Sequence, residues 1–208
     1  MQTDKEKQPF HMPSIILVLG LLVFGALIAC FILEWDYFMC PQSERPFHVD
    51  FNRLRPSGRM GLIWSITGTV LIFFNLSYLI RRYLIGWHWL GSLRYWLGFH
   101  MMTGLIASMA IILHSTLIFS SPLATLAFWC LQLTTITGLS GMIFYMHFSL
   151  SIEKRQIQGH EPSPKVKCLL QTFRFLHRWL AIFLITTLLL HILVSIKFGN
   201  LWILGGRT

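Results

Sequence analysis

Long apolar stretches separated by shorter polar connections make up most of this chain. Five stretches are long and apolar enough to cross the hydrocarbon core of a bilayer, which takes about 20 helical residues. The pattern therefore predicts an all-α integral membrane protein with five transmembrane helices. The predicted spans are Ser14 to Leu33, Met60 to Ile80, Gly98 to Phe119, Leu123 to His147 and His177 to Ile196.

The composition supports a membrane environment and argues against a nucleic-acid partner. Hydrophobic residues make up 54% of the chain and charged residues 12%, and the mean hydropathy is +0.61. The net charge of +9 is explained by basic residues beside anionic lipid head groups. The N-terminal segment and the connections on the same side of the membrane carry 11 Lys and Arg residues, and the segments on the opposite side carry 6. Because Lys and Arg concentrate on the cytoplasmic side, this difference predicts a cytoplasmic N-terminus and a periplasmic C-terminus.

Two pairs of histidines lie inside the third and fifth predicted helices. His100 and His114 share one helix, His177 and His191 share the other, and each pair is 14 positions apart. That spacing places the two imidazoles of a helix roughly 21 Å apart along the axis. Their directions differ by about 40° around the axis, so both leave nearly the same face. Each helix therefore offers two ligands at two depths of the membrane.

The third and fifth helices run in the same direction, because one helix lies between them along the chain. His100 then lies at the depth of His177, and His114 at the depth of His191. A haem iron between each pair would take one nitrogen from either helix, so the pattern predicts two b-type haems in a bundle of the second to fifth helices. A single intramembrane histidine is as often a packing or proton-relay residue as a metal ligand, but two pairs of equal spacing favour haem.

Small residues near the histidines have two readings. Gly104 and Ala107 lie between His100 and His114, and they either leave room for a porphyrin or allow close helix packing. The same choice stays open for the glycines of the 137–141 run TGLSG.

Other side chains are candidates for supporting the haems. Thr103 and Thr187 are weak candidates for hydrogen bonds to the second ring nitrogen of a ligand. Arg94, Arg82 and Arg178 lie near the cytoplasmic end, where they would either face haem propionates or only set the topology.

From 91 to 198 the chain resembles the diheme b-type cytochrome subunits of bacterial inner membranes. It is most similar to small, largely uncharacterised cytochromes of this type, and more distantly to ferric-reductase-type and respiratory dehydrogenase cytochrome b subunits. The segments that carry the resemblance are GSLRYWLGFH at 91–100, LHS at 113–115, LSG at 139–141, FLHRWL at 175–180 and LHI at 190–192.

The resemblance implies haems held by His100 with His177 and by His114 with His191, and electron transfer across the bilayer. No Gly-rich phosphate loop for a nicotinamide and no Cys-x-x-Cys-His motif for a covalent haem occurs in the sequence. We therefore expect an electron-transfer subunit of an oxidoreductase complex. Its partners would be a quinone pool or a redox protein such as a c-type cytochrome, an iron–sulfur subunit or a flavin subunit.

Two further functions stay open on the sequence. The chain could reduce ferric iron or a small oxidised substrate directly at a haem edge, or it could anchor and assemble a larger complex. A quinone head group could use the aromatic rim of Trp87, Trp89, Tyr95 and Trp96 with His88 or His147, although both histidines are more often interfacial anchors.

Two cysteines near the first helix raise separate questions. Cys30 and Cys40 could form a disulfide on the outer side, although their connectivity cannot be read from sequence. Cys30 also ends a lipoprotein-like signal, Leu27 to Cys30, but the apolar run continues beyond it, which favours a plain transmembrane helix.

The predicted organisation has five parts. They are a cytoplasmic segment over 1–13, a first transmembrane helix over 14–35, a polar outer loop over 36–59, a four-helix diheme domain over 60–198 and an outer tail over 199–208. Within the domain, the connection from Phe148 to Arg174 contains Gly159, Pro162 and Pro164 and is predicted to be irregular.

Overall fold

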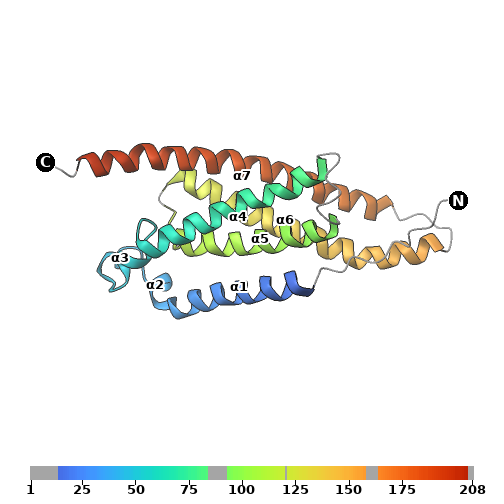
Figure 1. Cartoon of the computed structure of the whole chain (residues 1–208), viewed down its shortest axis with the longest axis horizontal. Coiled ribbons are helices and arrows are strands. Elements are labelled where there is room, and N and C mark those ends of the chain that lie inside the picture. The colour runs from blue at the N-terminus through green and yellow to red at the C-terminus, as the bar shows by residue number, and fades with distance from the viewer. Residues whose placement is uncertain (1–13, 84–92, 120, 158–163, 206–208) are drawn as a thin grey trace.

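The computed structural model describes residues 14–83, 93–119, 121–157 and 164–205, and all of its regular elements are helices (Figure 1). The long helices are α1 (Ser14–Leu33), α4 (Arg59–Tyr83), α5 (Leu93–Ser115), α6 (Pro122–Ile157) and α7 (Pro164–Gly205). The short ones between α1 and α4 are α2 (Trp35–Met39), η1 (Arg45–Phe47) and α3 (Phe51–Leu54).

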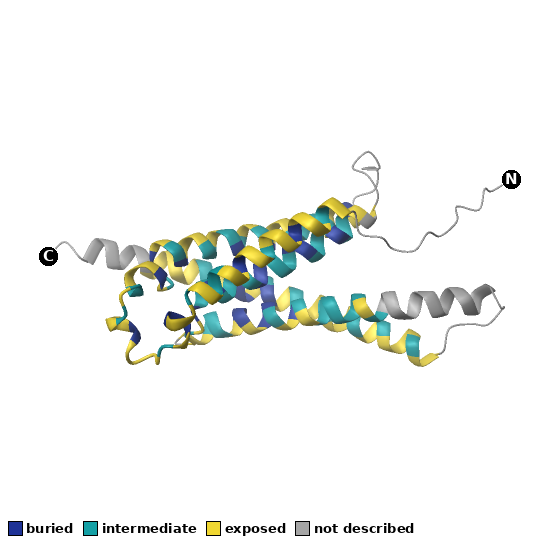
Figure 2. Ribbon diagram, turned by 90° about the horizontal axis from the view of Figure 1, so that it is seen from below, coloured by how far each residue is buried: buried dark blue, intermediate teal, exposed yellow. Residues whose placement is uncertain are grey.

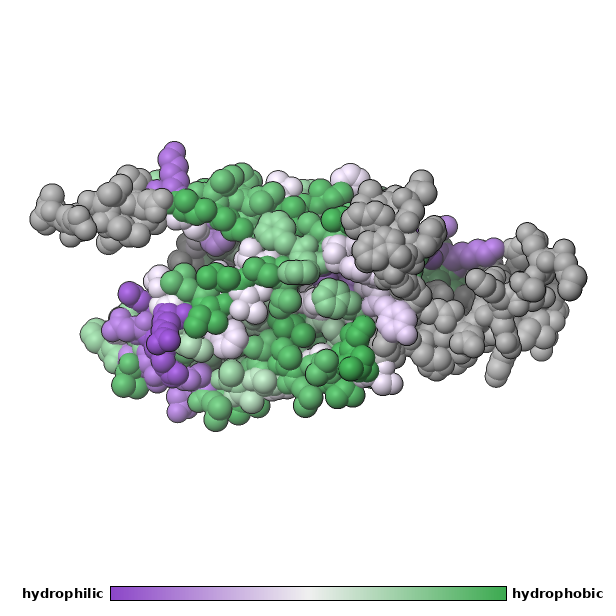
Figure 3. Space-filling view, in the orientation of Figure 1, coloured by the Kyte–Doolittle hydropathy of each residue, from purple (hydrophilic) through white to green (hydrophobic). Residues whose placement is uncertain are grey.

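All five long helices have a stretch that is long and apolar enough to span a membrane, which confirms the predicted number of spans. Many large apolar side chains on these helices are exposed, and they form broad hydrophobic areas on the face seen in Figure 3. In water such surfaces would be costly, whereas in a bilayer lipid chains cover them. The protein is therefore a probable multi-pass membrane protein.

The helices are arranged as two close pairs with one helix outside. α4 packs along α5 and α6 packs along α7, and α1 lies against α5 on the side away from α7 (Figure 1). The pairs meet around one apolar cluster to which all four helices contribute, and some of the buried residues lie in this middle region (Figure 2). The cluster comprises Ile72, Ala107, Cys130, Leu131, Leu184 and Leu188.

Several helix ends differ from the predicted ones. α5 ends at Ser115 and not at Phe119, because Thr116 and Leu117 take the left-handed backbone conformation, with φ of 47° and 57°. The connection predicted to be irregular is helical up to Ile157 and again from Pro164. The N–H at the first position of a helix has no partner within the helix, so proline, which lacks this N–H, is tolerated there. Pro164 therefore starts α7 where the sequence pattern indicated a loop.

The short helices close one end of the bundle, which we call the His114 end; the other is the His100 end. Arg53 bonds both Glu34 and Asp50 there, at 2.7 and 2.8 Å. Gly61, in the first turn of α4, lies so close to the preceding turn that an added Cβ would overlap the carbonyl oxygens of Arg55 and Pro56.

We expect Gly61→Ala to destabilise the fold by about 1–3 kcal/mol, because the atoms that it would overlap are backbone atoms that cannot rotate away. The measurement is the thermal midpoint of the full chain in detergent. Gly25→Ala in α1 is the matched control, since nothing lies within 4 Å of a Cβ there. Equal midpoints for the two variants would contradict the close approach at Gly61.

Candidate metal centres

α5 and α7 bring the predicted histidines together in pairs. The ring centroids of His100 and His177 are 6.2 Å apart with an interplanar angle of 76°. A metal ion between two imidazoles, with bonds of about 2 Å to each, places the centroids about 6 Å apart. The structure therefore holds these rings at a separation that fits one shared metal ion.

The second pair lies at the other end of the same helices. His114 and His191 lie near each other there, and both rings are partly buried. The apolar cluster of Ala107, Leu184 and Leu188 lies between the two pairs. The pairs are thus two separate sites, one on either side of the packed centre of the bundle.

Backbone carbonyls of the neighbouring helices hold three of the rings. Nδ1 of His100 lies 3.2 Å from the oxygen of Asn75, and Nδ1 of His114 lies 3.0 Å from that of Gly61. On the other helix pair, Nδ1 of His177 lies 3.0 Å from the oxygen of Thr134. A carbonyl only accepts, so each Nδ1 donates its proton and leaves the Nε2 lone pair for a metal ion.

The register of the antiparallel helices explains why these contacts recur. Asn75 and Gly61 are 14 residues apart on α4, the same separation as His100 and His114 on α5. The corresponding step back from Thr134 leads to position 120, which precedes α6 and lies outside the described residues. Because the acceptors are backbone carbonyls, this equal spacing follows from the helix register and leaves no signal in the sequence.

The two threonines proposed as supporting residues bond elsewhere. The hydroxyl of Thr103 donates to the side-chain oxygen of Asn75 and to the carbonyl of Phe99, and that of Thr187 donates to Phe183 in its own helix. A helix carbonyl one turn away is a common acceptor for a threonine hydroxyl. Because Nδ1 of His100 bonds the Asn75 carbonyl, the prediction for Thr103 is wrong, whereas that for Thr187 stays a prediction.

Glycines set how closely two helices approach these sites. A Cβ at Gly138 would lie 3.0 Å from Cε1 of His177, so the ring packs directly on the α6 backbone. Gly104 lies against the side chain of Asn75, where a Cβ would be 2.9 Å from Nδ2. Gly141 faces Phe173. These glycines thus allow close approach between helices within a pair.

The arginines near the His100 end differ in burial. Arg82 and Arg178 are exposed, and the side chain of Arg94 lies outside the described residues. Arg81, which the sequence reasoning did not single out, is buried at the end of α4. It follows Tyr78 by one helical turn, and the Tyr78 ring lies 5.1 Å from that of His100.

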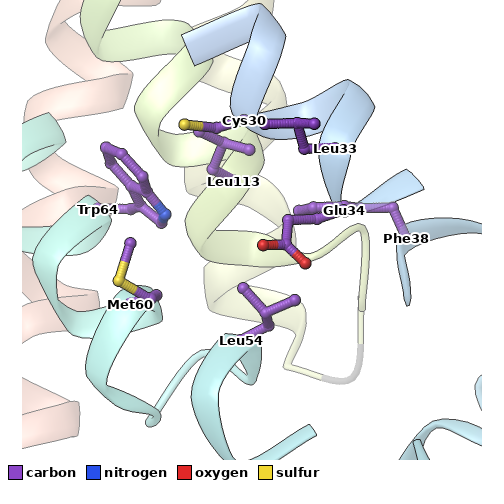
Figure 4. Close-up of a pocket in the computed structure, with 8 residues that line it drawn as sticks. All are labelled: Cys30, Leu33, Glu34, Phe38, Leu54, Met60, Trp64 and Leu113. Carbon is purple, nitrogen blue, oxygen red and sulfur yellow. The ribbon is translucent and has the colours of Figure 1, made fainter. Parts of the chain in front are cut away.

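The structure describes only some of the residues suggested for quinone contact. Tyr95 is exposed and Trp96 partly buried, whereas Trp87, His88, Trp89 and the side chain of His147 lie outside the described residues. A pocket of about 70 Å³ does occur at the His114 end, between α1, α4 and α5 (Figure 4). Cavities that hold a benzene ring measure about 150 Å³, so this pocket is too small for a quinone ring. Its lining residues are Cys30, Leu33, Glu34, Phe38, Leu54, Met60, Trp64 and Leu113.

The cysteines form no centre of their own in the described part of the chain. Cys30 and Cys40 are free thiols, and α1 continues as a helix beyond Cys30 to Leu33. Among the described residues, no group of three or more His, Cys, Asp or Glu side chains could hold a metal ion. The candidate centres are therefore two-ligand sites, and a structural zinc site needs four ligands.

Comparison with known proteins does not assign the chain to a family. No family model, no curated protein and no solved structure matches it.

We expect the protein without a bound metal ion to hold His100, His114 and His177 as the tautomer with the proton on Nδ1. The matched control is His48, whose Nδ1 accepts a hydrogen bond from the backbone N–H of Asp50 at 3.1 Å and whose neutral ring therefore carries its proton on Nε2. Nitrogen-15 NMR of histidine-labelled protein above neutral pH distinguishes the two tautomers. Assigned spectra in which the rings of His100, His114 and His177 carry their proton on Nε2, as His48 does, would contradict the carbonyl contacts.

Proposed function

We propose that the chain transfers single electrons across a membrane through two b-type haems, each held between two histidines. The observation that carries the proposal is the facing pair His100 and His177, 6.2 Å apart, with both Nδ1 atoms turned to carbonyls. In this arrangement both Nε2 atoms remain for one iron. His114 and His191 would hold the second haem in the same way.

The bundle suits a planar group better than a compact ion. α5 and α7 carry the facing ligands, yet each packs most closely on its other neighbour, α4 or α6. The helices that would sandwich a macrocycle are thus less close to each other than each is to its pair partner. When bound, the haems would supply the one-electron redox chemistry, and the protein would supply ligands, orientation and a low dielectric.

The depth of the two sites explains why they would act as a path. Fourteen residues of helix separate the ligands on each of α5 and α7, which places the irons roughly 21 Å apart along the bundle. That distance is most of the hydrocarbon thickness of about 30 Å. One site would therefore exchange electrons near one surface and the second near the other.

The resemblance and the charge distribution extend this proposal to the cell. The membrane would be the inner membrane of a bacterium, with the N-terminus and the His100 end on the cytoplasmic side. A quinone pool or a redox protein would deliver electrons on one side, and a redox protein would receive them on the other.

The ligand assignment predicts which haem each histidine holds. We expect two haems per chain in the wild type and one in His114→Leu or His191→Leu. Each of these substitutions removes one of the two axial ligands that would hold the same haem. His100→Leu and His177→Leu should each lose the other haem. The readouts are haem quantitation and reduced-minus-oxidised spectra of the purified full chain.

His48→Gln serves as the matched control, since this histidine packs on Tyr37 outside both pairs. It should keep both haems. A wild type without haem, or four ligand variants that all retain two haems, would overturn the proposed function.

The close contact at Gly138 predicts a change confined to one haem. In Gly138→Ala the new methyl group displaces the ring of His177, so the low-spin electron paramagnetic resonance signal of the His100–His177 haem should shift while the other stays. Gly141→Ala is the control, because its Cβ would meet Phe173 only at 3.4 Å. A shift of both haem signals, or of neither, would contradict the packing of His177 on α6.

A further inference from the structure

Arg45 is a buried cation at the His114 end of the bundle. Its side chain is 6% exposed, although it belongs to η1 in the loop between α1 and α4. The guanidinium donates to the carbonyls of Cys40 at 2.9 Å and Phe38 at 2.7 Å, and to that of Thr116 after the end of α5. It therefore ties the loop to the turn that follows the ligand helix.

The charge of Arg45 has no acidic partner among the described residues. The described salt bridges all belong to Arg53, which is exposed and bonds Glu34 and Asp50. Carbonyl groups satisfy three of the five N–H donors of Arg45 without neutralising it. A buried charge that lacks a counter-charge is costly, so this position favours an anion.

Two buried hydroxyl groups beside Arg45 also lack hydrogen-bond partners. Tyr37 is 1% exposed and Thr116 is 0% exposed, and neither Tyr37 Oη nor Thr116 Oγ1 has a partner. The guanidinium carbon of Arg45 lies 5.6 Å from the centre of the Tyr37 ring, and the Thr116 carbonyl bonds the same guanidinium. Unpaired buried polar atoms are rare, so their clustering indicates a missing acceptor.

The state of the tyrosine fits a donor role. Burial raises the pKa of Tyr37, so its hydroxyl keeps its proton at physiological pH. We call Arg45, Tyr37 and Thr116 the Arg45 cluster. It offers two guanidinium N–H groups that have no partner within the described residues, and two hydroxyl groups. This set of donors matches a carboxylate, which has two acceptor oxygens and one negative charge.

We propose that the Arg45 cluster binds a carboxylate, and that this carboxylate is a propionate of the haem held by His114 and His191. The assignment rests on the proposed function, because it needs that haem to be present. Its location supports it, since Thr116 follows His114 by two residues and carries one of the donors. It also differs from the cations expected from sequence, Arg94, Arg82 and Arg178, which lie at the other end of the bundle.

The test uses the full chain with its haems bound. The propionate bending bands in resonance Raman spectra report hydrogen bonding to the carboxylates, and thermal midpoints report stability. The variants are Tyr37→Phe and Arg45→Gln, and Arg53→Gln is the control because it removes an exposed arginine of the same loop.

We expect Arg45→Gln and Tyr37→Phe to shift a propionate band that Arg53→Gln leaves in place. Tyr37→Phe should also lower the thermal midpoint, because it removes a hydrogen bond to a carboxylate. If the hydroxyl bonded nothing, its removal would leave or raise the midpoint. Tyr37→Phe retains the guanidinium and its three carbonyl contacts, so the test stands even where Arg45→Gln fails to fold.

Repeating Arg45→Gln or Tyr37→Phe in the His114→Leu background identifies the haem concerned. The band shift should disappear there, because the haem in question is lost. A shift that persists would place the cluster at the other haem and overturn the proposal. Unchanged bands in both variants of a two-haem protein would also overturn it while leaving the proposed function intact, whereas a wild type without haem would remove both.

Added acetate distinguishes a haem carboxylate from a free one. If a propionate occupies the cluster, acetate should leave the thermal midpoint of the wild type unchanged relative to chloride at equal ionic strength. A midpoint that rises with acetate in the wild type and not in Arg45→Gln would show a site for free carboxylates and would overturn the assignment to haem.

Discussion

The hydrogen bonds from imidazole Nδ1 to helix carbonyls are the constraint on which the candidate sites depend. A helix carbonyl already accepts one bond within its own helix, and its second lone pair can accept a side-chain N–H. In the low dielectric of a bilayer such a bond fixes both the orientation and the tautomer of the ring. Because Asn75, Gly61 and Thr134 provide these carbonyls, α4 and α6 determine where the rings on α5 and α7 point.

Close helix approach makes these bonds possible. The ring of His177 packs on the backbone of α6 at Gly138, and Gly61 allows the start of α4 to lie against the preceding turn. Small residues have this role in membranes because packing contacts, and not the release of water, hold transmembrane helices together. The glycines therefore affect the sites through the distance between helices. Gly138 contributes no ligand, but its lack of a side chain lets the His177 ring lie against α6.

The His114 end differs from the His100 end in how its charge is held. A loop of short helices brings Arg45 beneath the turn after α5, where three carbonyls fix it. At the His100 end the buried arginine is Arg81, which belongs to a transmembrane helix. Among the described side chains, each pair of histidines thus has one buried arginine beyond it, supplied by a loop in one case and by a helix in the other.

Hydrophobic periodicity and length predicted the number of membrane helices, because the thickness of a bilayer imposes a length that local sequence must satisfy. The boundaries were less predictable. The left-handed residues Thr116 and Leu117 end α5 early, and Pro164 begins a helix where a loop was expected. Such ends depend on backbone conformations that hydropathy does not encode.

The sequence by itself determined which histidines are paired, since equal spacing on two helices of the same direction leaves one matching by depth. Only the tertiary structure decided what supports the rings and where cations are buried. A carbonyl contact involves no particular side chain, so Gly61 and Thr134 carry no sequence signature of their role. Burial of Arg45 depends on a loop folding against a turn 71 residues away, and a contact of that range is fixed by packing and not by local pattern.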